Sequence, residues 1–529
     1  MFGMKWSEGR QPKAAHPMST QAEAARLLKE LPYENPAKAV LEASAWLESA
    51  ESEPMFSAAH RLMLVSMIDD ATHASAEELT LAYVGARTGL PAQPGDWRAL
   101  MDYLDRLAAG YAAALQAYEA NPGDDIAPRI ATAVVRMMRT VTRSMKVSWM
   151  RYLPPDRASW ELLVHGYRAA LGHGFAKKAI PAYARESQYT SPLHELSLGV
   201  MMAAAAPQSL TPRQVQIVYA VAHAYRAAFG VSEAYDESWR HYLFDLHRPG
   251  PPARIPEQLS NQGGLLFFSG EHVLPKLQAL LSGSSEEGSA MNPFTGEFGI
   301  TEVRGALEHV ARYWDDNPPA RRDERKRLNT KIQVEIGIAA LQRALEVALE
   351  ESRDLSMLGE ASGEPAEQGG GVVAMNAWTL TDFSARGIGA RVVRRLDRWL
   401  RVGSILGFKL ERSDKWCVGI VRRLRTDARN QTDVGVEILA KAAILVTLEG
   451  SGLAGGVAQL AGSAMRSTAL MLPEDVQLNA RASLLFEPGT NAPGQIFVLH
   501  DGDTSRRIKL GHVSEWLDGW QRVEFDWVE

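Results

Sequence analysis

The sequence predicts a multidomain α+β protein, with an all-α N-terminal region followed by antiparallel β structure. Two observations lead to this fold class. From Ser19 to about Phe244, apolar residues recur at helical spacing, as they do on the buried face of an amphipathic helix. After Pro319, apolar and polar residues begin to alternate, which is typical of half-buried strands. The length of 529 residues leaves room for about three or four domains of ordinary size.

The helical region is expected over residues 19–245, as a bundle or an irregular array of helical hairpins. Ser19-Thr20 offers a cap to one amphipathic run, and Asn35-Pro36 combines an Asn cap with proline at the first helical position. Alanine is abundant, which favours closely packed helices, and no 34-residue repeat is present. Residues 246–318 are expected to be a connector with short helices at Val273–Leu281 and Ile300–Tyr313, packed on the helical region.

The β region is expected to contain a barrel over residues 319–440 and an additional β extension over residues 441–529 packed on that barrel. One helix, Ala339–Glu351, interrupts it. The strands are predicted at Lys331–Ile336, Ile405–Leu410, Trp416–Leu424, Val434–Leu439, Ala443–Leu448, Ala482–Phe486, Gln495–Leu499, Arg507–Val513 and Arg522–Trp527. Another strand is expected around Val392, and glycines punctuate the whole region.

A cluster of cations lies directly before the first of these strands. Five of the seven residues from Arg321 to Arg327 are arginine or lysine. The planar fork of arginine can hold phosphate oxygens or pair with the O6/N7 edge of guanine. Charge runs of this kind are more often solvated surface, so the cluster alone does not identify a site.

A second motif, Asp-x-Ser-x-x-Gly, is formed by Asp382, Ser384 and Gly387 between two predicted strands. Asp and Ser side chains commonly cap their own turn, and glycine supplies positive φ. The same residues can also present a carboxylate, a hydroxyl and an open backbone to a polar ligand. Both interpretations fit the sequence of this segment.

Taken together and in this order, the two motifs resemble the PilZ domain family, many of whose members bind cyclic di-GMP. Arg321 and Arg325 match the Arg-x-x-x-Arg loop of that family, and the later motif matches its Asp/Asn-x-Ser-x-x-Gly turn. The resemblance spans residues 321–440 and implies a six-stranded, PilZ-like antiparallel β-barrel. In the family, the loop arginines reach phosphates and guanine, while the turn contacts the other base. The resemblance implies a ligand-binding set of Arg321, Arg322, Arg325, Asp382, Ser384 and Gly387, with Arg327 and Arg386 as candidate auxiliary phosphate contacts.

Two alternatives remain open at this point. Arg322 and Lys326 have the same spacing as Arg321 and Arg325, so the register of the arginine loop is not decided. Arg325 and Asp382 are 57 positions apart, a long separation for this family. A degenerate PilZ-like protein that binds no nucleotide, and serves as a structural or protein-interaction scaffold, is therefore the rival hypothesis.

Several other classes of protein are disfavoured. The single cysteine, Cys417, excludes an internal disulfide, and the 13 histidines show no metal-binding spacing. No phosphate-binding Walker loop or Gly-x-Ser-x-Gly elbow is present, so we expect no metal, no cofactor and no catalysis. The longest apolar stretch, Leu196 to Ala206, is too short for a transmembrane helix, which needs about 20 residues. The N-terminus lacks the apolar core of a signal peptide.

The net charge of -6 hides a basic segment, Arg391 to Arg429, with 12 Lys and Arg against 4 Asp and Glu. This segment would attract a dianionic dinucleotide, whereas the lack of interleaved surface aromatics and of a helix-turn-helix pattern disfavours nucleic-acid binding. We therefore predict a non-catalytic, cytoplasmic, bacterial cyclic di-GMP receptor or effector. Its PilZ-like barrel would be coupled to a helical adaptor domain that contacts a protein partner.

Overall fold

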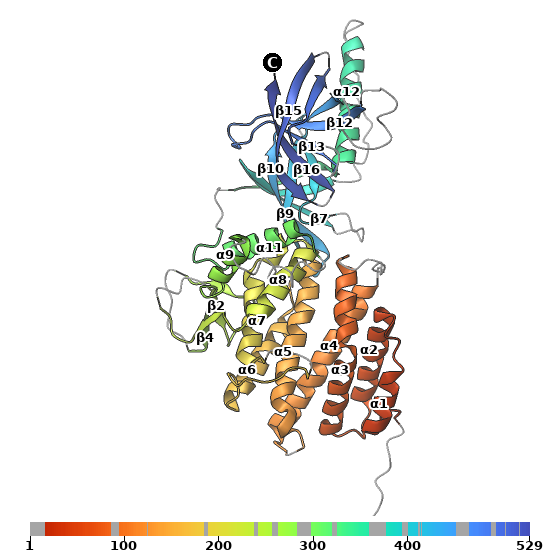
Figure 1. The fold of residues 1–529 in the computed structure, drawn as a ribbon, viewed down its shortest axis with the longest axis vertical. Helices are drawn as coiled ribbons and strands as arrows, with labels where there is room; N and C mark the ends of the chain where they lie inside the picture. Colours follow the sequence, from red (N-terminus) through yellow and green to blue (C-terminus); the bar gives the residue numbers. More distant parts are fainter. Residues whose placement is uncertain are drawn as a thin grey trace, which may run out of the picture. The chain divides into compact units, whose positions relative to one another are not determined.

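The computed structural model describes most of the chain, and its described residues fall into two compact units, Met1–Pro319 and Ala320–Glu529. We call these the helical unit and the barrel unit (Figure 1). The described residues are 16–85, 95–123, 125–184, 189–236, 242–256, 263–282, 298–319, 325–358, 377–393, 400–410, 413, 415–450, 465–487, 493–502, 504–517 and 519–528.

The helical unit is built from long helices, as the sequence predicts. The Thr20 side chain accepts a hydrogen bond from the Glu23 backbone N–H, and the Asn35 side chain accepts one from Lys38 N–H, so both predicted caps are confirmed. The first eight helices are α1 (Gln21–Lys29), α2 (Pro36–Ser52), α3 (Ala58–Tyr83), α4 (Asp96–Ala120), α5 (Ala127–Met150), α6 (Arg157–Gly172), α7 (Pro192–Ala204) and α8 (Pro212–Tyr225).

Helix α5 is the central element of the helical unit. Figure 1 shows it with α3 and α4 on one side and α6 and α7 on the other, and 18 of its 24 residues are buried. A helix that is buried on nearly every side belongs to the interior of a large domain. The polar side chains that α5 carries are therefore held inside the domain and not on its surface.

A small antiparallel sheet, which the sequence did not predict, follows α8. Its strands are β1 (Gly230–Ser232), β2 (Tyr242–Asp245), β3 (Ala253–Arg254) and β4 (Leu265–Ser269), in the order β1-β4-β2-β3. The two predicted short helices follow as α9 (Leu274–Ser282) and α11 (Ile300–Tyr313). Directly after α11, the fully buried Trp314 donates from Nε1 to the Met201 carbonyl of α7 at 3.0 Å. This contact fastens the segment to the same hydrophobic core as α1–α8.

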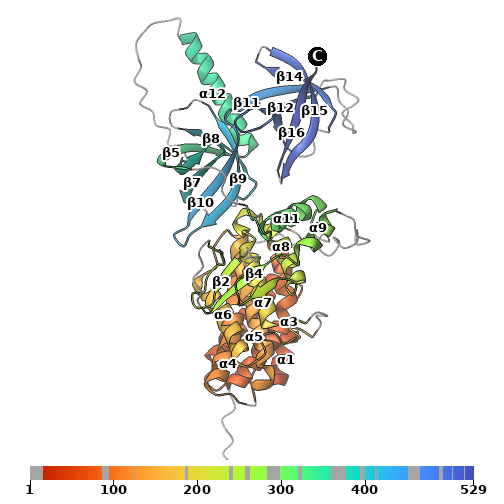
Figure 2. The ribbon, with the colours of Figure 1, turned by 90° about the vertical axis from the view of Figure 1, so that its left-hand side faces the viewer.

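The barrel unit begins with a closed six-stranded antiparallel barrel, which confirms the predicted architecture and which we call the first barrel (Figure 2). Its strands are β5 (Lys326–Ile336), β6 (Ala377–Ser384), β7 (Gly387–Val393), β8 (Ile405–Leu410), β9 (Cys417–Thr426) and β10 (Gln431–Ala440). The predicted helix appears between β5 and β6 as α12 (Ile338–Leu358).

The remaining strands close into a second barrel instead of extending the first. They are β11 (Ile444–Gly450), β12 (Met465–Leu472), β13 (Ser483–Phe486), β14 (Ile496–Asp501), β15 (Thr504–Leu517) and β16 (Trp520–Val528). In both barrels the six strands, numbered along the chain, neighbour one another in the cyclic order 1-2-3-6-5-4. The second barrel therefore repeats the topology of the first.

The two barrels share a buried contact. Leu341 of α12 and Trp416 of the first barrel belong to the same apolar cluster as Leu470 and Trp520 of the second. Trp520 also donates from Nε1 to the Gly403 carbonyl at 2.8 Å. Among the described residues, no helix is long and apolar enough to cross a membrane.

Candidate functional site

The described residues of the two predicted motifs lie side by side on the first barrel. Arg325 directly precedes β5, and Asp382 and Ser384 lie in β6. The antiparallel pairing of β5 with β6 places Arg327 opposite Asp382. Pairing of two adjacent strands thus brings together residues that are 57 positions apart in the sequence.

An ion pair joins the two motifs. Arg325 Nη1 donates a hydrogen bond to Asp382 Oδ1, and the two side chains are 29% and 28% exposed. Thr381 Oγ1 donates to the other carboxylate oxygen, Oδ2, at 3.3 Å. The carboxylate is therefore held at the end of the β5–β6 pair with part of its surface facing solvent.

Two glycines of β7 make room for this ion pair. A Cβ on Gly389 would lie 2.2 Å from Asp382 Oδ2, and one on Gly387 would lie 2.8 Å from the Val436 carbonyl oxygen and 3.7 Å from Arg325 Nη2. Gly387 does not have the positive φ that the turn interpretation of the motif assigned to it. Close approach of neighbouring groups, not an unusual backbone conformation, therefore favours glycine here. Gly389 was missed by the sequence analysis, although the Gly-x-Gly alternation places both glycines on the same face of the strand.

Ser384 closes the turn between β6 and β7. The serine is buried, and its Oγ donates to the Gly387 carbonyl at 3.2 Å. The Arg386 carbonyl accepts from Ile438 N–H at 3.0 Å, which fixes the same turn to β10. Ser384 thus has a structural role in the turn, whereas the Asp382 carboxylate remains partly exposed.

The structure brings together only part of the predicted site. Arg321 and Arg322 lie outside the described residues. Arg327 on β5 and Arg386 in the turn are both exposed. Arg325, Asp382, Ser384 and Gly387 form a continuous group on β5, β6 and β7.

Part of the basic segment is neutralised on the barrel surface. Arg391 donates to Asp433 at 2.8 Å, and Arg422 pairs with Glu437 at 2.6 Å and with Glu515 at 2.7 Å. These cations are therefore engaged with local carboxylates. The excess of Lys and Arg counted from the sequence therefore overestimates the positive electrostatic potential that a ligand would meet on the barrel surface.

The second barrel carries a different arrangement at the matching position. There Lys441, ahead of β11, pairs with Asp475, after β12, at 3.4 Å. Ten residues, 473–482, connect β12 to β13, where the first barrel has a two-residue turn. No Asp-x-Ser-x-x-Gly motif occurs in that connection. The candidate site therefore belongs to the first barrel.

Comparison with known families gives a match within each of the two units. Residues 22–234 match the family described as cyclic-di-GMP receptor FimW, N-terminal domain, and residues 360–444 match its middle PilZ domain. Together these matches cover more than half of the chain. No curated protein matches the chain.

The matched regions agree with the elements of the fold. The first covers helices α1 to α8, whose family could not be identified from their sequence pattern. The second contains β6 to β10 with Asp382, Ser384 and Gly387, and it confirms the resemblance to PilZ domains. Arg325 and β5 precede the matched residues but complete the same closed barrel. The chain therefore belongs to the family of cyclic-di-GMP receptors that join this N-terminal domain to a PilZ domain.

Proposed function

We propose that this chain binds cyclic di-GMP where Arg325 and Asp382 meet on the first barrel, and that it passes the signal to a protein partner of the helical unit. The observation that carries the proposal is the ion pair between the two motifs. It places a guanidinium and a carboxylate together on a partly exposed surface. We further propose that the protein acts in the cytoplasm and changes no covalent bond of its ligand.

The chemistry of the site suits a guanine dinucleotide. The Asp382 carboxylate can accept hydrogen bonds from the N1–H and N2–H donors of guanine. The Arg325 fork can engage a phosphate or the O6/N7 edge of a base. Gly387 and Gly389 leave the strand surface beside these groups without side chains. Arg321 and Arg322 would supply further contacts, and Arg327 and Arg386 would be auxiliary phosphate ligands.

Ligand binding competes with the Arg325–Asp382 ion pair. Because both side chains are more than a quarter exposed, the pair contributes only about 0–1 kcal/mol and is readily exchanged for contacts to a ligand. In the free protein the pair keeps each group at its place. The site is therefore preorganised without being blocked.

The site shows no arrangement for catalysis among its described residues. The Ser384 hydroxyl is buried and donates to a backbone carbonyl, so it is not positioned as an activated nucleophile beside a base. We therefore expect cyclic di-GMP to leave the protein unchanged. Transmission of the signal would depend on geometry alone.

The position of Arg325 suggests how the signal could be transmitted. The helical unit ends at Pro319, and β5 begins at Lys326, so the segment that carries Arg321, Arg322 and Arg325 is also the covalent connection between the units. A ligand that engages these arginines together with Asp382 would hold this connection against β6. Ordering of a segment by a ligand is a common basis for switching.

Calorimetric titration of the full chain with cyclic di-GMP tests the proposal. We expect saturable binding with a dissociation constant of about 10 µM or tighter. We expect cyclic di-AMP to bind at least about tenfold more weakly, because adenine lacks the O6 acceptor and the N2 donor. Chromatography after incubation should recover intact ligand. Folded protein that gives no heat with cyclic di-GMP would favour the scaffold alternative.

Gly389→Ala should weaken cyclic di-GMP binding by about tenfold or more, because the new methyl group would displace the Asp382 carboxylate and its charge-assisted contacts. A Cβ at this position would be 2.2 Å from Oδ2, far inside van der Waals contact. Gly435→Ala in β10 is the control, since its Cβ would lie 3.3 Å from Arg423 Cβ. Equal affinities for the two variants would contradict the proposed role of Asp382.

A further inference from the structure

Helix α5 carries four cations on one buried face. Arg136, Arg139, Arg143 and Lys146 are spaced by 3, 4 and 3 residues, the spacing usually taken by apolar residues at a helix interface. Their exposed fractions are 7%, 3%, 6% and 1%. A buried charge is very unfavourable unless it is paired and hydrogen-bonded. Each of these four groups therefore needs an anionic partner.

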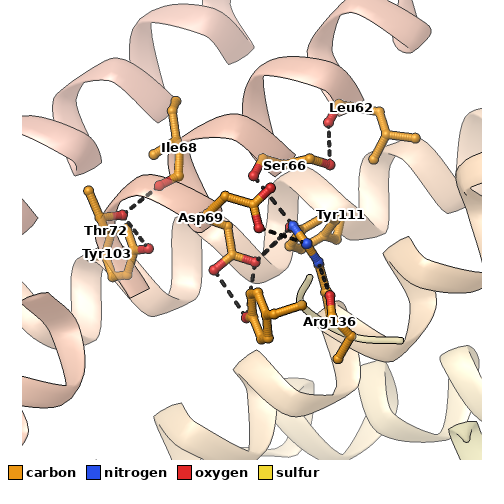
Figure 3. A network of polar contacts seen from close by, with 11 residues as sticks. Leu62, Ser66, Ile68, Asp69, Thr72, Tyr103, Tyr111 and Arg136 are labelled. Carbon is orange, nitrogen blue, oxygen red and sulfur yellow. Dashed lines mark hydrogen bonds and ion pairs between the residues drawn. The ribbon is translucent and has the colours of Figure 1, made fainter. Parts of the chain in front are cut away.

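Three of the four cations have such a partner. Arg136 pairs with Asp70 at 2.8 Å and lies 3.7 Å from Asp69, and Figure 3 shows Arg136 and Tyr111 converging on Asp69. Arg139 contacts Glu195 at 2.7 Å, and Lys146 lies 3.6 Å from Glu77. The partners come from α3 and α7, so these ion pairs join α5 to its neighbours.

Arg143 is the exception. Among the described residues, its guanidinium donates no hydrogen bond and has no carboxylate oxygen within 4.0 Å. Its main electrostatic neighbours are Tyr183, Glu77 and Tyr219. Its nitrogens are not completely enclosed by protein atoms. The Arg143 guanidinium therefore has no hydrogen-bond partner within the described part of the chain.

Two further polar groups beside Arg143 have hydrogen-bonding capacity left within the described part of the chain. Lys146 Nζ is buried, and its nearest carboxylate oxygen, on Glu77, lies 3.6 Å away, beyond the length of a good hydrogen bond. It lies 4.3 Å from the centre of the Tyr219 ring, and the Tyr219 hydroxyl makes no hydrogen bond to a described residue. Burial lowers the pKa of Lys146 to about 8, with Glu77 acting against that shift, so the amine is still mostly charged at neutral pH. A guanidinium, an ammonium and a hydroxyl thus gather where α5 meets α8.

We propose that the helical unit binds a small oxyanion, a phosphate or carboxylate group, at Arg143, Lys146 and Tyr219. An oxyanion offers hydrogen-bond acceptors to all three donors, and it would be an anionic partner for Arg143. The Glu77 side chain beside Lys146 is 35% exposed, so this end of the stripe lies close to the molecular surface. The site is separate from the dinucleotide site, and neither proposal depends on the other.

Phosphate is the first probe. Thermal unfolding of the full chain is compared in sodium phosphate and in sodium chloride at equal ionic strength, with amide hydrogen exchange followed in α5 and α8. We expect phosphate to raise Tm by about 2–4 °C and to slow exchange in those two helices. The same measurements with acetate show whether the site takes a carboxylate instead. Repeating them with cyclic di-GMP in the Arg325→Ala variant tests whether the phosphates of the dinucleotide can occupy the site.

Arg143→Met separates an anion site from a structural arginine. We expect this variant to lose the anion response completely and, in chloride, to unfold at a higher temperature than the parent, because an unpaired buried charge has been removed. Arg157→Met is the matched control, since Arg157 is an 82% exposed arginine of α6, and it should keep the full response. A parent protein that responds to neither anion would overturn the proposal. So would an Arg143→Met variant that keeps the response or unfolds at a lower temperature in chloride.

Discussion

Arg325→Ala is expected to weaken cyclic di-GMP binding by about a hundredfold, and Asp382→Ala by about tenfold or more, because each removes charge-assisted contacts to the ligand. Within the described part of the Arg-x-x-x-Arg loop, Arg325 is the residue whose side chain contacts the Asp-x-Ser-x-x-Gly motif. Its loss would remove a bidentate donor from phosphate or base and leave the Asp382 carboxylate without its cation. Calorimetric titration of each purified variant measures the change.

The first barrel supplies a matched control for these variants. Arg391 and Asp433 form a similar pair between β7 and β10 at 2.8 Å, with side chains 50% and 47% exposed. Arg391→Ala removes an arginine–aspartate pair of the same kind from the same barrel, so we expect its affinity for cyclic di-GMP to be unchanged. If Arg325→Ala also binds normally, the proposed arginine register is wrong, and Arg321 and Arg322 become the next residues to replace.

Alternation of polar and apolar residues predicts half-buried strands most directly. The end of β5, Lys331–Ile336, was expected, but its first six residues are all exposed and show no pattern. Strand β12 was missed for the opposite reason. Leu470 and Leu472 pack toward the first barrel, while Ala469 and Met471 face the core of the second. A strand buried on both faces reads as a continuous apolar run, so the closure of the second barrel could not be predicted.

The sequence could predict the two motifs of the candidate site but not the contact between their side chains. Resemblance to a family joined Arg325 to Asp382, and only the pairing of β5 with β6 shows that the two side chains meet. The cations of α5 were missed because charged residues are expected on a solvated face. Their 3-4-3 spacing between buried methionines and valines was the available signal. Burial of this stripe depends on carboxylates that α3 and α7 supply from distant parts of the sequence.

Glu195→Ala should destabilise the helical unit by about 3–5 kcal/mol, because it leaves buried cations without their anion. Glu195 is fully buried and accepts hydrogen bonds from Arg139 Nη2 at 2.7 Å and from Thr190 Oγ1 at 2.6 Å. Arg226 Nε lies 3.7 Å from the same carboxylate. Glu161→Gln is the control, since its pair with Arg157 is exposed and should be worth about 0.5 kcal/mol or less. Chemical denaturation followed by far-UV circular dichroism measures both changes, and similar losses in the two variants would contradict the predicted role of the buried pair.

The same carboxylate should make the helical unit sensitive to acid. Burial alone would raise the pKa of Glu195, but the charge and hydrogen bonds of Arg139 hold that pKa at about 2, against an ordinary value of 4.5. Between these values the unfolded chain binds the proton that the folded chain excludes. The stability from this group is therefore complete above pH 4.5 and is lost as the pH falls toward 2. Glu77, whose pKa is also about 2, gives the parent and the variant the same pH dependence of stability. Its effect therefore cancels when their unfolding free energies are compared. Glu195→Gln should then be less stable than the parent at pH 7. The difference between their unfolding free energies should become smaller as the pH falls below 4.5. A difference that does not change with pH would show that Glu195 is not ionised in the folded protein.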